Sequence, residues 1–271
     1  MKRLIYLPLF AALFFLSGCG DFKGSPFTDR SESGLRDSNA RQLARLSDGG
    51  DDGLPLRFAL ISDSHQNITD LERAVNRINS GQFDFTAHLG DFTDSSYGME
   101  YDLFIEVIRG LRRPWLVGIG NHDSIVEGKA LFRKHFGSWN FSYEFKGIKF
   151  IFFNNISLEF SPDYGWLEDE VSATSLPVVI FQHIPPDGDT FSDDELAMND
   201  RIIRNPNVKA VFHGHDHKFT TEFHADGTLI QQVARTEGVH WAEAEVRGGV
   251  MTVWVCEKDG CDEAVNYPLN N

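Results

Sequence analysis

The sequence predicts an α/β fold in which two mixed β-sheets pack together and are flanked by helices, an α/β/β/α sandwich. Short apolar runs that end in turn residues alternate with amphipathic stretches, a pattern typical of parallel strands joined by helices. Two alternating runs in the middle of the chain indicate a hairpin, and the C-terminal third lacks a strong helical pattern. The second half therefore adds mostly strands, and no internal repeat is visible.

The apolar runs are brief, rich in β-branched or aromatic residues and bounded by turn residues, which predicts buried strands. They cover residues 56–61, 83–89, 115–119, 178–181 and 208–212. Apolar residues at helical spacing predict helices over residues 69–79, 97–111, 127–136 and 165–174. The hairpin is expected at residues 141–145 and 149–153, around Lys146-Gly147, and more strands at residues 228–255.

The N-terminus has the features of a sorting signal. Lys2 and Arg3 precede a short apolar segment, and small residues then lead to Cys19. The apolar segment is shorter than the roughly 20 residues that a membrane-spanning helix needs. The pattern resembles the lipobox of bacterial lipoproteins, which implies a signal peptide over residues 1–18 and a lipid on Cys19. We therefore expect a cell-envelope protein that is anchored to a membrane by this lipid.

Residues 19–56 begin at the predicted lipid site and are rich in Ser, Gly, Asp and Arg. They contain few large apolar residues, so they bury too little surface to offset the entropy of ordering them. We predict a flexible tether here, with at most a helical turn at residues 39–46. Residues 57–271 have the length of one domain with a full core.

The chain is acidic, with a formal net charge of −15 at pH 7. Such a surface repels the phosphates of DNA and RNA at long range, which argues against a nucleic acid polymer as the main substrate. A local cationic site remains compatible with a small anionic substrate.

Two cysteines, Cys256 and Cys261, flank a Glu-Lys-Asp-Gly segment whose Asp-Gly pair favours a tight turn between strands. A disulfide across this hairpin is plausible in an exported protein. A zinc site would need further ligands nearby, and the neighbouring sequence does not supply them.

Polar residues of a restricted kind follow each of the predicted strands. The segments are Asp63-Ser64-His65, Gly90-Asp91-Phe92-Thr93-Asp94, Gly120-Asn121-His122-Asp123, Gln182-His183-Ile184-Pro185-Pro186 and His213-Gly214-His215-Asp216-His217. Any one of them alone is compatible with a helix cap or a turn. Together they lie at the carboxyl ends of successive strands, where open α/β sheets bind ligands. The sequence therefore predicts one site at this edge.

Oxygen and imidazole donors without thiolate favour a hard or borderline divalent metal such as manganese, iron or zinc. The candidate ligands are more numerous than one ion can use. A carboxylate shared between two ions would explain the excess.

The order of these segments resembles that of the calcineurin-like metallophosphoesterases, from about residue 57 to residue 255. The resemblance implies a metallophosphoesterase-like sandwich over residues 57–271. It also implies one metal held by Asp63, His65 and His217, a second metal held by Asn121, His183 and His215, and Asp91 bridging the two.

The same resemblance implies the catalytic residues. His122 is expected beside the scissile ester as a proton donor or transition-state stabiliser, oriented by the carboxylate of Asp94. Asp123 is a weaker candidate for a supporting role. His213 and Asp216 are expected in packing or in contacts outside the ligand set.

The implied reaction is hydrolysis of a small phosphodiester or phosphomonoester by a hydroxide that bridges two metal ions. Ser95 stands where the serine/threonine protein phosphatases carry a phosphate-binding arginine, which disfavours a phosphoprotein substrate. Arg235 either approaches the site or is a surface residue, and residues 187–200 are expected to overhang it. The alternative function is a non-catalytic, metal-containing binding or scaffold lipoprotein.

Overall fold

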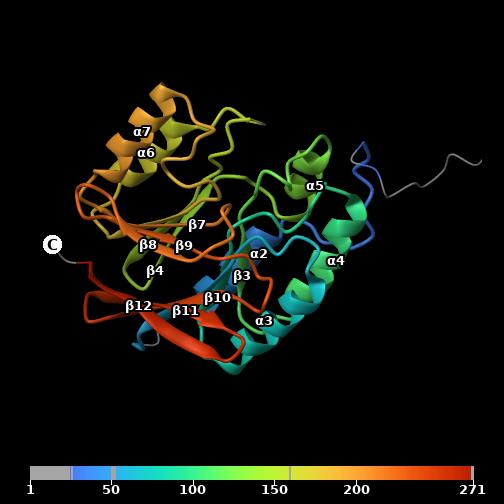
Figure 1. The fold of residues 1–271 in the computed structure, drawn as a ribbon, viewed down its shortest axis with the longest axis horizontal. Coiled ribbons are helices and arrows are strands. Elements are labelled where there is room, and N and C mark those ends of the chain that lie inside the picture. The colour runs from blue at the N-terminus through green and yellow to red at the C-terminus, as the bar shows by residue number, and fades with distance from the viewer. Residues whose placement is uncertain (1–24, 26, 50–52, 159, 270–271) are drawn as a thin grey trace, which may run out of the picture.

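The computed structural model describes residues 25, 27–49, 53–158 and 160–269, and it contains two six-stranded β-sheets (Figure 1). The first sheet has the order β12 (Gly260–Pro268), β11 (Val250–Glu257), β10 (Trp241–Arg247), β1 (Leu56–Ile61), β2 (Phe85–His88) and β3 (Trp115–Val117). The second has the order β4 (Phe141–Phe145), β5 (Ile148–Phe152), β6 (Val178–Phe181), β7 (Val208–His213), β9 (Leu229–Gln232) and β8 (Thr220–Phe223). The helices are α2 (Ser38–Gly49), α3 (Ile68–Ser80), α4 (Gly98–Ile108), α5 (Gly128–His135), α6 (Tyr164–Ser172) and α7 (Asp193–Ile203).

Both sheets are mixed, which confirms the predicted fold class. Strands β1, β2 and β3 are parallel, whereas β10, β11 and β12 extend the first sheet as antiparallel neighbours. In the second sheet β5, β6, β7 and β9 are parallel, and the hairpin strand β4 and strand β8 pair antiparallel at its edges. The parallel strands of each sheet direct their carboxyl ends to one edge, which is where the polar segments follow.

Three buried layers of side chains separate the sheets and helices. Because successive side chains of a strand point to opposite faces, Phe58 and Leu60 of β1 pack between the two sheets, and Ala59 and Ile61 pack under α3 and α4. Phenylalanine fills much of the layer between the sheets, and the rings of Phe58 and Phe85 stack at 5.2 Å. A third layer lies beneath α6 and α7, on the far side of the second sheet (Figure 1).

The prediction of a flexible tether over residues 19–56 does not hold for residues 38–49, which form helix α2. Helix α2 packs on the domain, where Leu46 is buried between the sheets and Leu35, ahead of the helix, joins the outer core. The amide of buried Asn39 donates to the carbonyl of Val117 and accepts from its N–H, both at 2.9 Å. Leucines spaced along the segment provide the apolar side chains that pack on the domain. The polar average composition of the segment hid this pattern in the sequence.

The predicted signal peptide and lipid site, residues 1–19, lie outside the described residues. Among the residues that the structure describes, no helix combines the length and the apolar character needed to cross a membrane.

Helix α7 and a disulfide complete the second half of the chain. Residues 193–203, part of the segment expected to overhang the site, form helix α7, which begins with a capping box between Ser192 and Glu195 and packs on the outer layer. Cys256 and Cys261 are opposite each other in the β11–β12 hairpin and form a disulfide. Their sulfur atoms are therefore not thiolate ligands.

Candidate metal centre and active site

The loops that follow β1, β2, β6 and β7 bring six predicted ligands into two groups. Their ligating atoms lie within 4.8 Å of one another in each group. One group comprises Asp63, His65 and His217, and the other comprises Asp91, His183 and His215. The grouping matches the predicted assignment, and each group combines residues from both sheets.

The seventh predicted ligand, Asn121, joins the second group. Its Oδ1 atom lies 3.0 Å from Nε2 of His183 and 3.1 Å from Nδ1 of His215. The carboxylate of Asp91 reaches both groups, because its Oδ2 atom is 3.2 Å from Nε2 of His183 and 4.0 Å from Nε2 of His65. Asp91 is thus placed where a shared ligand would stand.

Unusual backbone conformations direct these side chains into the site. Five of the ligands have positive φ, which is uncommon for residues other than glycine: Asp63 (48°), His65 (45°), Asp91 (55°), His215 (77°) and His217 (64°). Such strained residues cluster at functional sites, where the surrounding structure holds them in place. Gly120 packs so closely against Asp91 that a Cβ atom at this position would collide with the carboxylate.

Hydrogen bonds to the second ring nitrogen orient two of the imidazoles. The Nδ1 atom of His183 lies 3.0 Å from the carbonyl oxygen of Leu89, and Nδ1 of His65 lies 3.1 Å from that of Thr93. Since a carbonyl accepts, each Nδ1 carries the proton and donates. Nε2 is therefore the ring atom of both residues that faces the site and is available to bind a metal.

Asp123 holds the segment that carries Asp91. Its buried carboxylate accepts hydrogen bonds from the backbone N–H groups of Asp91, Phe92, Thr93 and Gly120, at 2.7 to 3.0 Å. Burial and the charge of Asp91 raise the pKa of Asp123 to about 7, while the N–H donors oppose this increase. The supporting role expected for Asp123 is thus a structural one.

His88 is a supporting residue that the sequence reasoning missed. It is buried beneath the site, where Nε2 lies 3.1 Å from Oγ of Ser64 and Nδ1 accepts from the N–H of Gly90 at 3.2 Å. Burial lowers its pKa to about 3, so the ring is neutral and connects the β1 and β2 loops. The signal for this role was a histidine at the last position of a buried strand, directly before the ligand-bearing turn.

The electrostatics of the ligands favour a cluster of negative carboxylates and a charged imidazole in the metal-free protein. Burial opposes the charge on His183, but the nearby carboxylates of Asp91, Asp63 and Asp123 raise its pKa to about 9. Burial also opposes the charge on Asp63, but a hydrogen bond from His217 and the charge of His183 hold its pKa at about 2. The pocket therefore stabilises positive charge among its carboxylates, which is what a cation needs.

The contact predicted between Asp94 and His122 differs in kind from the expectation. The Nδ1 atom of His122 lies 2.7 Å from the backbone carbonyl oxygen of Asp94, not from its carboxylate. The carboxylate instead contacts Nδ1 of His65 at 2.8 Å. Asp94 therefore orients both rings, because a single residue can present its carbonyl and its side chain to different partners.

His122 lies at the edge of the first group. Its ring is 5.0 Å from the ring of His65, and its backbone N–H donates to Oδ1 of Asp91 at 2.8 Å. The side chain is partly exposed. It is placed beside the ligands without belonging to either group.

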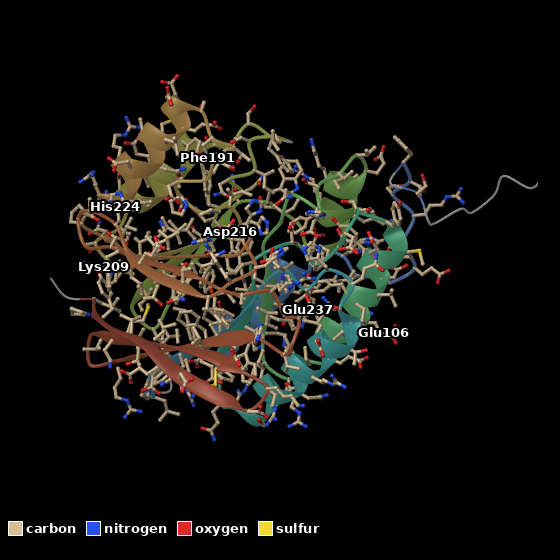
Figure 2. The ribbon with its side chains drawn as sticks, in the orientation of Figure 1. Glu106, Phe191, Lys209, Asp216, His224 and Glu237 are labelled. Atoms are coloured by element: carbon tan, nitrogen blue, oxygen red, sulfur yellow. A yellow bond between two sulfur atoms is a disulfide. The ribbon has the colours of Figure 1, made fainter. Side chains whose placement is uncertain are left out.

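His213, Asp216 and Arg235 border the ligands. His213 is buried, with Nδ1 3.1 Å from the carbonyl oxygen of Gly214, and burial lowers its pKa to about 4. Asp216 lies near the centre of the view in Figure 2, in the loop between His215 and His217. Arg235 pairs with Ser62 in an isolated parallel bridge, directly before the ligand Asp63.

The donor set fits divalent metal ions. Each group combines one carboxylate with two imidazoles, and Asn121 adds an amide oxygen. Manganese, iron and zinc accept such donors. His65 and His183 both direct Nε2 toward the other candidate ligands, and His183 would bind a metal after losing its Nε2 proton. The two groups of side chains could therefore hold divalent ions at adjacent positions.

The chain belongs to the calcineurin-like phosphoesterase family, whose family model matches residues 56–219. A probable cyclic nucleotide phosphodiesterase from Fibrobacter succinogenes is 27% identical over 192 residues, which is 61% of this chain and 74% of that protein. This family membership confirms the resemblance seen in the sequence.

Solved structures of low sequence identity share the fold. A dimetal phosphatase from Danio rerio is 13% identical with a TM-score of 0.67, and the match covers 79% of this chain and 99% of that one. A purple acid phosphatase from yellow lupin (Lupinus luteus) is 10% identical with a TM-score of 0.65, covering 79% of this chain and 53% of that one. GAP50, described as the anchor in the inner membrane complex of Plasmodium, is 12% identical with a TM-score of 0.61, covering 80% of this chain and 89% of that one.

Proposed function

We propose that this protein is a cell-envelope phosphoesterase that hydrolyses small phosphodiesters or phosphomonoesters with two divalent metal ions. The observation that carries the proposal is the meeting of seven ligating side chains from five loops of two sheets. Asp91 supports a binuclear site because its carboxylate lies between the two groups. The relative from Fibrobacter succinogenes makes cyclic nucleotides the first diesters to test.

The candidate ligands carry less negative charge than two divalent ions carry positive charge. When bound, the ions supply a nucleophile from water at neutral pH and neutralise charge on the phosphoryl oxygens. Asp63 and Asp91 are the carboxylates among the seven ligands, and the histidines and Asn121 add no negative charge. Two divalent ions therefore leave the centre positive, which favours a phosphate ester in an otherwise acidic protein.

His122 is the residue proposed to transfer a proton. Its Nδ1 atom is engaged by the carbonyl oxygen of Asp94, so Nε2 is the atom left to exchange a proton with the leaving oxygen. General acid–base catalysis of this kind typically contributes about 10²- to 10⁴-fold to the rate.

A metal-dependent assay with matched variants tests this function. The chain from residue 20 onward, loaded with manganese, zinc or iron, would be given a chromogenic monoester, a chromogenic diester and cyclic nucleotides. We expect turnover by the wild type, and a loss of at least about 100-fold for His122→Ala and for Asp91→Asn. His224→Ala, which removes an imidazole that bridges Asp200 and Asp226 on another surface, is the control and should retain activity.

The outcome that contradicts the proposal is equal, background-level turnover in all of these proteins with every metal. That result, combined with stoichiometric metal binding, would favour the alternative of a non-catalytic binding or scaffold protein.

The envelope location is supported by the N-terminal sequence pattern. We expect the full chain to fractionate with membranes and to label with a fatty acid. Cys19→Ser should abolish the label and release the protein into the soluble fraction. Retention of that variant on membranes would contradict the lipid anchor.

A further inference from the structure

The loop after β9 returns Arg235 to the edge of the metal centre. Arg235 forms a parallel bridge with Ser62, and the next residue, Thr236, donates to the carbonyl oxygen of Ser62 through both its N–H (3.1 Å) and its hydroxyl (2.9 Å). Ser62 directly precedes the ligand Asp63. The backbone of Arg235 is thereby fixed beside a ligand loop and is not part of a free surface segment.

The guanidinium of Arg235 is incompletely satisfied. It makes one ion pair within the described residues, from its Nη1 atom to Oε2 of Glu237 at 3.2 Å, and Glu237 is itself 58% exposed. The Nε atom is buried and has no hydrogen-bond partner among the described residues. A buried donor without a partner is costly, so a group that accepts from this arginine would be favoured.

Arg235 brings a positive charge beside the loop after β1, because its backbone is bridged to Ser62, directly before Asp63. Figure 2 labels Asp216 and Glu237 near the middle of the view, between the strands and helices α3 to α5. Arg235 is thus a cation at the edge of a site in a chain of net charge −15.

A guanidinium is suited to phosphate because its N–H groups match the spacing of two phosphoryl oxygens. The loop after β2 contains no basic side chain, since Ser95 follows Asp94 there. Arg235 belongs to a different element, the loop after β9, and lies beside the loop that carries Asp63.

We propose that Arg235 is a substrate-binding residue that contacts a phosphoryl oxygen of the ester, with Glu237 as the counter-ion that it partly releases when substrate binds. The proposal rests on the proposed function for its substrate class, an anionic phosphate ester. Arg235, which lies outside the ligand set, would recognise the phosphoryl group, whereas His122 would transfer the proton.

The test compares Arg235→Ala, Arg235→Lys and Glu237→Gln with the wild type. Measurements are KM and kcat on the chromogenic ester that the wild type turns over best, and the Kd of inorganic phosphate for the manganese-loaded protein by calorimetry. We expect Arg235→Ala to weaken phosphate binding and lower kcat/KM about 10- to 100-fold, the range for hydrogen bonds to charged groups. Arg235→Lys should recover part of the loss, because lysine keeps the positive charge but lacks the paired N–H groups of the guanidinium.

Glu237→Gln gives an effect of opposite sign. Without its carboxylate partner, Arg235 is more available, so phosphate binding should tighten by about 2- to 5-fold. Arg201→Ala, which removes an exposed arginine that pairs with Glu168 on the α6–α7 surface, is the control and should change neither constant. The melting temperature of each variant is measured in parallel.

Unchanged phosphate affinity in Arg235→Ala, or in both Arg235→Lys and Glu237→Gln if the alanine variant does not fold, would overturn the proposal and leave Arg235 a structural residue. If the wild type lacks turnover but binds phosphate in an Arg235-dependent way, the proposed function fails while the anion contact stands. The two failures are therefore distinguishable.

Discussion

The Nε2 atom of His183 lies 3.2 Å from Oδ2 of Asp91, although the two residues follow strands of different sheets, β6 and β2. The site therefore exists only when the two sheets pack in the correct register. In the layer between the sheets, the rings of Phe85 in β2 and Phe181 in β6 are in contact, with centroids 6.5 Å apart. Packing between the sheets and assembly of the metal centre are consequently coupled.

This contact predicts that metal uptake depends on pH. In the metal-free protein the carboxylates raise the pKa of His183 from 6.5 to about 9, against the effect of burial. Between these two values the folded chain holds a proton that the unfolded chain has lost. The stability contributed by this proton is full below pH 6.5 and is lost as the pH rises through 9.

A metal must displace this proton, so we expect the apparent affinity for manganese to increase from pH 7 to pH 9, with proton release on binding. Calorimetry in buffers of different ionisation enthalpy counts the released protons. Asp91→Asn removes the main stabilising charge and should reduce that count near neutral pH. Binding without proton release in the wild type at pH 7.5 would contradict the assignment.

Asp94 should act on metal affinity more than on proton transfer. Its carboxylate contacts His65, whereas its carbonyl oxygen orients His122 and survives substitution. We expect Asp94→Ala to weaken metal binding about 10- to 100-fold, the usual effect of removing a partner of a ligating histidine. At saturating metal its kcat should stay well above that of His122→Ala. A kcat as low as that of His122→Ala under these conditions would show that the carboxylate serves catalysis directly.

The docking of helix α2 makes a prediction about stability. Asn39→Ala leaves the buried N–H and carbonyl groups of Val117 without partners, and we expect the free energy of unfolding to fall by about 2–4 kcal/mol. Asn79→Ala is the matched control, because Asn79 also bonds two backbone groups, those of Gly110 and Arg112, in an exposed setting. Its cost should be below about 1 kcal/mol. Urea denaturation measures both, and a loss for Asn39→Ala as small as that expected for Asn79→Ala would contradict a stabilising role of the α2 contact.

The disulfide should support stability without affecting the site. Cys256 and Cys261 close a short hairpin loop in β11 and β12, which are separated from β1 by β10. For a loop this short, the chain-entropy estimate is about 2 kcal/mol. We expect reduction, or the double variant Cys256→Ala/Cys261→Ala, to lower the melting temperature and leave kcat unchanged at 25 °C. A loss of turnover at a temperature where the protein remains folded would contradict this separation.

The sequence alone predicted the fold class and the candidate metal-binding residues that the structure brings together. Strand periodicity located β1, β6 and β7 within a residue of their ends, and the polar segments after the strands contain the six residues of the two candidate groups and Asn121 beside them. This works because a strand fixes the direction of its neighbours, and the carboxyl ends of parallel strands share one edge. The family order of the segments added the division into two groups.

Tertiary structure decided the contacts that depend on distant backbone. The sequence could not show that the backbone carbonyl of Asp94 contacts His122 while its carboxylate contacts His65. These contacts depend on the φ angles and side-chain rotamers of the folded chain. Nor could the sequence show that α2 docks beside Val117, that His88 links two loops, or that Arg235 returns to Ser62. The local sequence pattern indicates which residues follow each strand, but the packing of the two sheets decides which of their atoms come into contact.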